Sequence, residues 1–408
     1  MRRRTGTAFP PTACGAHDER FAPVVEVFEE QLTSFPYGGA ALAIVVDGVP
    51  VVDVWGGMAD AMAGKVWRRD TLAVPFSCSK SVTTIVVLTL VEQGILELDT
   101  PLAHYWPEFA DRGKRHITIR NVLSHRAGLP SVDAPLSFAD VCDGGPLVAA
   151  LEGQQPLWEP GSGHAYHALT VGALIGEVVR RATGETLGAI LREHLCTLLD
   201  LDMWIGLPPS HHSRVAPVLP PSPADYIPAV HEPVVDYLRN DVRILQALTL
   251  AGAVRIPVVG LTIETDWNDP RLWSAELPAG NTMTTARSLA KLHAALVSEM
   301  VDNAGNRIPS ILSPSTLRDA RECLSDGAPI IGPDSGPFPR WGTGFMLSSH
   351  ARPMLSENSF GHDGAAGGLC FADDDHRVGF AFLPSVMGTG PDSRADRIVD
   401  ELRHCITQ

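Results

Sequence analysis

The chain has 408 residues, of which 45% are hydrophobic, and a formal net charge of −15. A chain of this length forms two domains or one large interleaved fold, and its apolar content supports a substantial core. The acidic balance argues against nucleic acid or an anionic membrane surface as a partner. No run of about 18 apolar residues is present, so we expect no membrane span.

Secondary-structure signals favour strands at both ends of the chain and helices in the middle. Asp47-Gly48 separates two β-rich runs and predicts a hairpin within residues 40–55. Further expected elements are helices over residues 81–94, 119–125, 169–183, 187–195, 242–252, 284–300 and 392–405, a long ordered loop over residues 205–233, a strand over residues 342–347 and a second hairpin at residues 368–371 and 378–383.

This order of elements predicts an α+β fold. Residues 1–100 and 280–408 are expected to build one antiparallel sheet from both chain ends, flanked by helices. Residues 101–279 are expected to form an inserted, mainly helical domain.

Seven scattered cysteines, with no C-x-x-C pair among them, predict free thiols in a reducing compartment. Residues 1–4 (MRRR) begin like a signal peptide, but residues 9–11 (FPP) interrupt the one candidate for an apolar segment after them. We therefore expect a cytoplasmic protein. There is no zinc-ligand spacing and no phosphate-binding glycine loop, so neither a metal nor a cofactor is expected. The sequence does not determine an oligomeric state.

Ser77 and Lys80 form an S-x-x-K pattern just before the helix expected over residues 81–94. This spacing puts both side chains on one face of a helix, where an amine of lowered pKa can take the proton of the hydroxyl. Free backbone N–H groups at a helix start also favour a developing oxyanion. Taken alone, the pattern fits an N-capping serine and a solvated lysine equally well.

Ser288 and Lys291 repeat the same pattern inside the helix expected over residues 284–300. No free backbone donors are expected in the interior of a helix. We interpret this second copy as an ordinary helix surface.

Several further segments accompany the first copy: residues 70–80, 93–99 (QGILELD), 105–107 (YWP), 117–129 (ITIRNVLSHRAGL), 158–161 (WEPG) ahead of Tyr166, and 361–364 (GHDG) ahead of Gly367-Gly368. Together they resemble the serine β-lactamase and penicillin-binding-protein superfamily. The closer resemblance is to its class C-like esterases and acyltransferases, the family VIII carboxylesterases. It extends from about residue 21 to about residue 403 and implies the α/β sandwich of the β-lactamase and transpeptidase type.

The resemblance implies a role for each motif. Ser77 would be the nucleophile, and Lys80 and Tyr166 would move protons, with Tyr166 as a tyrosinate or as a tyrosine that shares its proton with Lys80. The backbone N–H groups of Ser77 and Ala365 would form the oxyanion hole. His362-Asp363-Gly364 stands where many β-lactamases have Lys-Thr-Gly and would bind substrate, although His362 could instead support its strand.

Four functions fit these motifs, and the leading one is a carboxylesterase acting on a small ester through an acyl-enzyme. An acyltransferase, which passes the acyl group to an alcohol or amine, is the alternative. Ala168 replaces the asparagine that β-lactamases usually carry two residues after the tyrosine, and this counts against a β-lactamase or D,D-peptidase. The fourth function is a sensor domain that is acylated without turnover.

Overall fold

The computed structural model describes residues 12–221, 241–257, 264–302, 304–388 and 392–407. The strands are β1 (Cys14–His17), β2 (Gly39–Val46), β3 (Val49–Asp60), β4 (Lys65–Val66), β5 (Met203–Trp204), β6 (Met283–Thr284), β7 (Met300–Val301), β8 (Arg307–Ile308), β9 (Arg340–Trp341), β10 (Met346–Leu347), β11 (Ser359–Asp363), β12 (Leu369–Asp373) and β13 (Val378–Pro384).

The α-helices are α1 (Ala22–Ser34), α2 (Ser79–Glu92), α3 (Leu102–Tyr105), α4 (Ile119–Leu123), α5 (Phe138–Asp143), α6 (Gly145–Gly153), α7 (Thr170–Thr183), α8 (Leu187–Ile190), α9 (Thr197–Leu199), α11 (Val242–Thr249), α12 (Pro270–Ser274), α13 (Ala286–Val297), α14 (Pro314–Ala320) and α15 (Arg394–Thr407). Within the described residues, no helix is both long and apolar enough to cross a bilayer.

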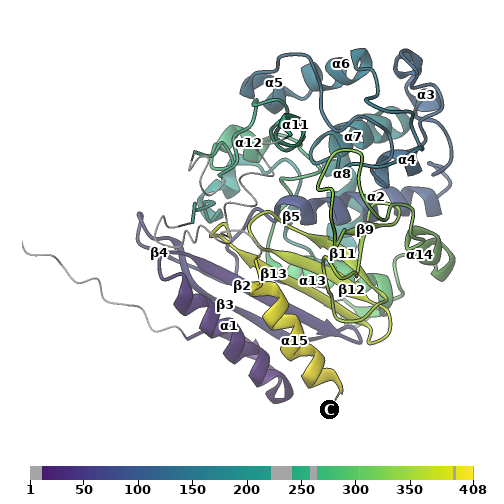
Figure 1. The fold of residues 1–408 in the computed structure, drawn as a ribbon. Coiled ribbons are helices and arrows are strands. Elements are labelled where there is room, and N and C mark those ends of the chain that lie inside the picture. The colour runs from purple at the N-terminus through teal and green to yellow at the C-terminus, as the bar shows by residue number, and fades with distance from the viewer. Residues whose placement is uncertain (1–11, 222–240, 258–263, 303, 389–391, 408) are drawn as a thin grey trace, which may run out of the picture.

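One antiparallel sheet joins the two ends of the chain. Its strand order is β1-β3-β2-β13-β12-β11-β10-β9, and β4 pairs with β3. In Figure 1 the purple strand β2 lies directly beside the yellow strand β13. The prediction of an α+β fold with a sheet built from both chain ends is therefore confirmed, as are both predicted hairpins.

The two faces of the sheet belong to two different hydrophobic cores. Along β2, Leu42 and Ile44 face the core under α1 and α15, whereas Ala43 and Val45 face the opposite core. This alternation follows from the two-residue period of a strand. The small residues face the side on which α13 packs most closely, because a Cβ added to Gly379 of β13 would lie 2.2 Å from the Ala290 carbonyl oxygen of α13.

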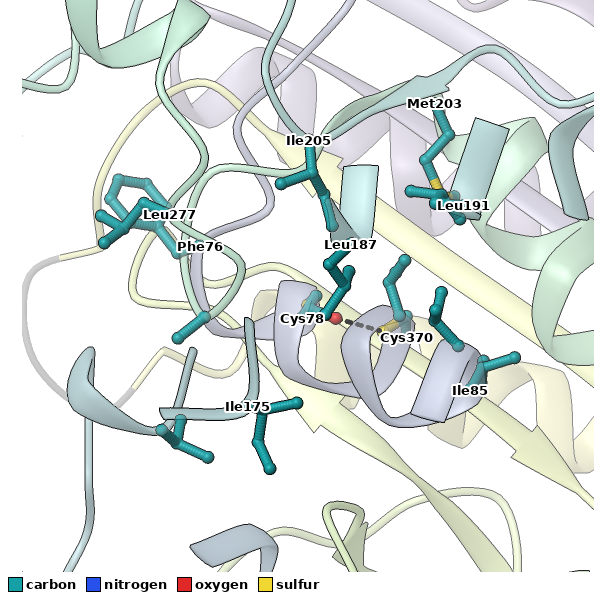
Figure 2. Packing of buried hydrophobic residues seen from close by; sticks show 14 of the residues in the cluster. Phe76, Cys78, Ile85, Ile175, Leu187, Leu191, Met203, Ile205, Leu277 and Cys370 are labelled. Carbon is teal, nitrogen blue, oxygen red and sulfur yellow. Dashed lines mark hydrogen bonds between the residues drawn. The ribbon is translucent and has the colours of Figure 1, made fainter. Parts of the chain in front are cut away.

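Helix α2 runs through the centre of the larger core. The helix is enclosed on all sides, and its residues Ser79 to Leu90, polar as well as apolar, are all buried. Figure 2 shows Ile85 of α2 in this core, close to Cys78 and to Cys370 of β12. Gly94 follows the end of α2 with φ +70, as expected for the residue after a helix C-terminus. The segment at residues 77–80 is therefore anchored on a rigid, buried element.

Other predictions need adjustment. The strand expected over residues 342–347 is wrong: the chain forms the hairpin β9–β10 there, with Gly342 N–H donating to the Phe345 carbonyl inside the turn. The helix expected over residues 284–300 is shorter, because Thr285 caps α13 and both flanks are strands. The expected loop over residues 205–233 contains a short 3-10 turn, Pro209–Arg214, and its residues 222–233 lie outside the described residues.

The remaining expected helices are present within a few residues of their predicted ends as α4, α7, α8, α11 and α15, and a π-helical turn (Leu191–Cys196) continues α8. Helices α3 to α8, with α11 and α12, lie on one side of the sheet region in Figure 1. The division into domains at residues 101–279 stays a prediction.

Candidate active site

Ser77 lies in a 3-10 turn, Phe76–Cys78, that leads directly into α2. Phe76 has φ +48, a left-handed conformation that costs a bulky residue about 1–3 kcal/mol. Its buried ring packs 4.7 Å from the ring of Trp267, centroid to centroid, and this packing holds the turn in place. Backbone strain at the residue before Ser77 is typical of a functional site.

Two polar side chains converge on the Ser77 hydroxyl. Lys80 Nζ lies 3.1 Å from Ser77 Oγ and also donates to the Ala279 carbonyl at 2.9 Å. The Tyr166 hydroxyl donates to Ser77 Oγ at 2.7 Å. The structure therefore brings together Ser77, Lys80 and Tyr166, although Tyr166 comes from a segment 89 residues further along the chain.

Burial changes the acid–base properties of both neighbours of Ser77. The Lys80 amine has its pKa lowered to about 7, because burial disfavours the ammonium form more than the charges of Asp363 and Cys78 favour it. Burial raises the pKa of Tyr166 well above its ordinary value, despite the opposing hydrogen bond to Ser77. Near neutral pH the site thus contains an amine that can accept a proton and a phenol that remains protonated.

Two backbone N–H groups are available next to Ser77. A Cβ added to Gly364 would lie 2.3 Å from the Pro75 carbonyl oxygen, so only glycine lets the end of β11 approach the Ser77 turn this closely. The Gly364 N–H donates to the Gly368 carbonyl, whereas the N–H of Ala365 has no acceptor among the described residues. Ser77 and Ala365 line the same pocket, where two such donors can bind an oxyanion.

The three residues of the predicted substrate-binding segment differ in their surroundings. Asp363 and Gly364 line the pocket with Ser77. His362 is only 1% exposed, and its Nδ1 lies 2.8 Å from the Asp363 carbonyl oxygen. Burial would raise the pKa of the Asp363 carboxyl, but hydrogen bonds and charge from His362 and Arg352 hold it at about 2. Asp363 is therefore ionised at any ordinary pH.

The pocket that Ser77 lines has a volume of about 320 Å³. Its wall is largely apolar and includes Leu248, Ile331, Phe338 and Trp341. It also includes His164, a residue that the sequence analysis did not single out, although its place two residues before Tyr166 is a signal that could have found it. Residues 327–339, rich in glycine and proline, supply much of the wall.

The second S-x-x-K copy lies away from this pocket. Ser288 is buried in the first turn of α13, where its Oγ accepts the N–H of Asp202 at 2.8 Å. Its interpretation as an ordinary helix surface is therefore wrong. The Ser288 hydroxyl has a structural role, since it satisfies a backbone donor in the interior.

Ser81 and His293 form another serine–histidine contact, with His293 Nε2 3.0 Å from Ser81 Oγ. Both residues have no exposed surface, and neither lines the pocket around Ser77. The Ser81 hydroxyl also donates to the Cys78 carbonyl at 2.8 Å, and His293 Nδ1 lies 2.8 Å from the Leu289 carbonyl oxygen. This pair ties α2 to α13, and no substrate atom can reach it without unfolding the core.

A serine held between a buried amine and a buried phenol, on a turn anchored to an antiparallel sheet, defines a serine hydrolase of the β-lactamase-like superfamily. The chain belongs to the beta-lactamase family, whose model matches residues 24–404. The family resemblance predicted from the sequence motifs is thereby confirmed, and the protein is an enzyme of this superfamily.

The chain is also similar to individual proteins of this superfamily. The chain is 31% identical over 376 residues to "Esterase/beta-lactamase LipL" of Mycobacterium tuberculosis. The aligned region covers 90% of this chain and 82% of the relative. The chain superimposes on a family VIII carboxylesterase with a TM-score of 0.81 and 29% identity, covering 96% of this chain and 99% of the other. The structure of EstA from Arthrobacter nitroguajacolicus Rue61a gives a TM-score of 0.80 at 30% identity, with coverage of 96% and 98%.

Proposed function

We propose that the protein is a carboxylesterase that works through an acyl-enzyme on Ser77. The observation that carries this proposal is the convergence of Lys80 Nζ (3.1 Å) and the Tyr166 hydroxyl (2.7 Å) on Ser77 Oγ, in a largely apolar pocket. The relatives named as esterases support the same choice.

In the acylation step, the neutral amine of Lys80 takes the proton of the Ser77 hydroxyl while Oγ forms a bond to the ester carbonyl carbon. The backbone N–H groups of Ser77 and Ala365 bind the resulting oxyanion, and each such donor contributes about 3 kcal/mol to transition-state stabilisation. As the bond to the alcohol oxygen breaks, the proton passes from Lys80 to the leaving alcohol, with the Tyr166 hydroxyl as the intervening donor. Water then repeats the sequence in reverse order and releases the acid.

Acyl transfer is the second candidate, and the apolar wall of the pocket favours it. Water that enters such a pocket loses hydrogen bonds, whereas an alcohol or amine with an apolar body gains by burial. The acceptor then replaces water at the acyl-enzyme without any change in the residues around Ser77.

The test is hydrolysis of p-nitrophenyl butyrate, followed together with the intact mass of the protein. We expect Ser77→Ala to lose turnover and the acyl adduct, whereas Ser288→Ala and Ser81→Ala, the two matched control variants, keep both. An adduct that persists in Ser77→Ala, or turnover that disappears only in Ser81→Ala, contradicts the proposal. Added alcohols or amines that increase p-nitrophenol release and yield a transfer product favour the acyltransferase, and an adduct that never turns over identifies a sensor.

All seven cysteines are free thiols in the structure. This observation supports a reducing, cytoplasmic location as part of the proposal.

A further inference from the structure

The pocket around Ser77 has a single charged group on its wall. Among the described residues that line the pocket, Asp363 is the one side chain that is ionised at ordinary pH. The Asp363 side chain keeps 31% of its surface exposed, so part of it faces the pocket while one carboxylate oxygen accepts a hydrogen bond from Arg352. A substrate bound in this pocket is therefore exposed to a fixed negative charge.

Arg352 does not cancel that charge. Its Nε donates to Asp363 Oδ2 at 3.1 Å, but its NH1 nitrogen donates to Asp396 Oδ1 at 2.7 Å. One guanidinium shared by two carboxylates leaves one net negative charge on these three side chains. His362 also faces this carboxylate, with its Nδ1 3.5 Å from Asp363 Oδ1. Lys80 offsets the net negative charge only below its pKa of about 7.

Aromatic rings form much of the same wall. The rings of Tyr166 and Trp341 stack with centroids 5.9 Å apart and an angle of 18° between their planes, and Phe338 lines the pocket beside them. The face of an aromatic ring attracts a cation within about 6 Å of its centroid, and the attraction grows when water is excluded. Lys80 Nζ already lies over the Tyr166 ring, 4.9 Å from its centroid. Phe338 is therefore the ring that can bind an ammonium ion together with the Asp363 carboxylate.

We propose that this pocket selects esters that carry an ammonium group in their alcohol or acyl part, and that it disfavours esters that carry a carboxylate. The inference rests on the proposed esterase function and adds a substrate class to it. It also gives a physical reason against β-lactam substrates, because the carboxylate of a penicillin would enter a pocket that already holds the Asp363 carboxylate.

The test compares pairs of esters that differ only in charge. For the alcohol part, the pair is butyrylcholine and its neutral isostere 3,3-dimethylbutyl butyrate. For the acyl part, it is the p-nitrophenyl esters of 4-(trimethylammonio)butanoic acid and of 5,5-dimethylhexanoic acid. In at least one pair we expect kcat/KM to be about tenfold higher for the cation, the scale of one cation–π contact from which water is partly excluded. The pair that shows the preference identifies the part of the substrate that carries the charge.

Asp363→Asn keeps the shape of the side chain and removes its charge, so we expect the ratio within that pair to fall to about one. The matched control Asp396→Asn removes a carboxylate on the other side of Arg352, which does not line the pocket, and should keep the preference. Because each ratio is taken within one variant, a general loss of activity cancels. With the wild-type protein, phenyltrimethylammonium should inhibit hydrolysis of p-nitrophenyl butyrate more strongly than tert-butylbenzene, a readout that needs no variant.

Ratios near or below one in both pairs of the wild-type protein, or a cation preference that survives Asp363→Asn, overturn the inference. If Ser77-dependent hydrolysis of the neutral esters continues in that case, the proposed esterase function stands without it. If no ester is hydrolysed in a Ser77-dependent way, the proposed function itself fails.

Discussion

The pKa of Lys80 leads to a quantitative prediction about the pH dependence of the reaction. Lys80 must be neutral to take the proton of Ser77, and its pKa is about 7 because the amine is buried. The neutral fraction is then about 10% at pH 6 and about 90% at pH 8. With the ordinary lysine pKa of 10.5, the neutral fraction at pH 7 would be lower by about three orders of magnitude.

We therefore expect kcat/KM for p-nitrophenyl butyrate to rise about tenfold per pH unit below pH 6 and to level off above pH 8, with a midpoint near pH 7. Initial rates from pH 5 to pH 9, corrected for spontaneous hydrolysis, provide the measurement. Asp363→Asn should move the midpoint to lower pH, because the Asp363 charge raises the pKa of Lys80 in the wild-type protein.

Lys80→Arg keeps the positive charge but cannot lose a proton, and we expect it to reduce kcat by about 10²-fold to 10⁴-fold. Lys291→Arg is the matched control, since Lys291 belongs to the second S-x-x-K copy and lies outside the pocket. A profile that is flat between pH 6 and pH 8, a midpoint near pH 10, or equal losses in the two variants would refute the assignment of Lys80 as the base.

Three further predictions concern the contacts around the site and the core. Gly364→Ala places a Cβ 2.3 Å from the Pro75 carbonyl oxygen, so kcat should fall about 10²-fold or more. In the control Gly153→Ala the added Cβ meets nothing within 4 Å, so kcat should stay unchanged. Equal rates in the two variants would contradict the proposed oxyanion hole. Tyr166→Phe should lower kcat about 10²-fold in the same ester assay, whereas the control Tyr105→Phe, at a tyrosine that does not line the pocket, should not. An unchanged rate in Tyr166→Phe would remove its hydroxyl from the mechanism. Gly379→Ala forces α13 away from β13 and should lower the free energy of unfolding by about 1–3 kcal/mol. Thermal or urea denaturation measures this change. A variant as stable as the wild type would show that the helix can shift at no cost.

Local patterns in the sequence were sufficient for much of the fold. The Asp47-Gly48 hairpin and the buried α2 depend on neighbouring residues, whose preferences and periodicity are visible in one segment. The same holds for the position of Ser77 ahead of α2. The hairpin at β9–β10 was missed, because two-residue strands give almost no periodic signal and are held by pairing with β11.

The candidate site likewise has features that local sequence predicts and features that only the structure shows. The motif at residues 77–80 is local, and its resemblance to known families extends to Tyr166 and to residues 362–364. The sequence could not tell that Ser288, with the same spacing, supports a backbone N–H of another segment.

By itself, then, the sequence determined the fold class, the family and the residues proposed for the acyl transfer steps. Only the tertiary structure decided their chemistry. Burial sets the pKa of Lys80 and keeps Tyr166 protonated, and burial depends on how distant segments enclose the two side chains. The fixed negative charge of the pocket depends on Asp363, Arg352 and Asp396, because charges interact through the distances between their atoms and not through their separation along the chain.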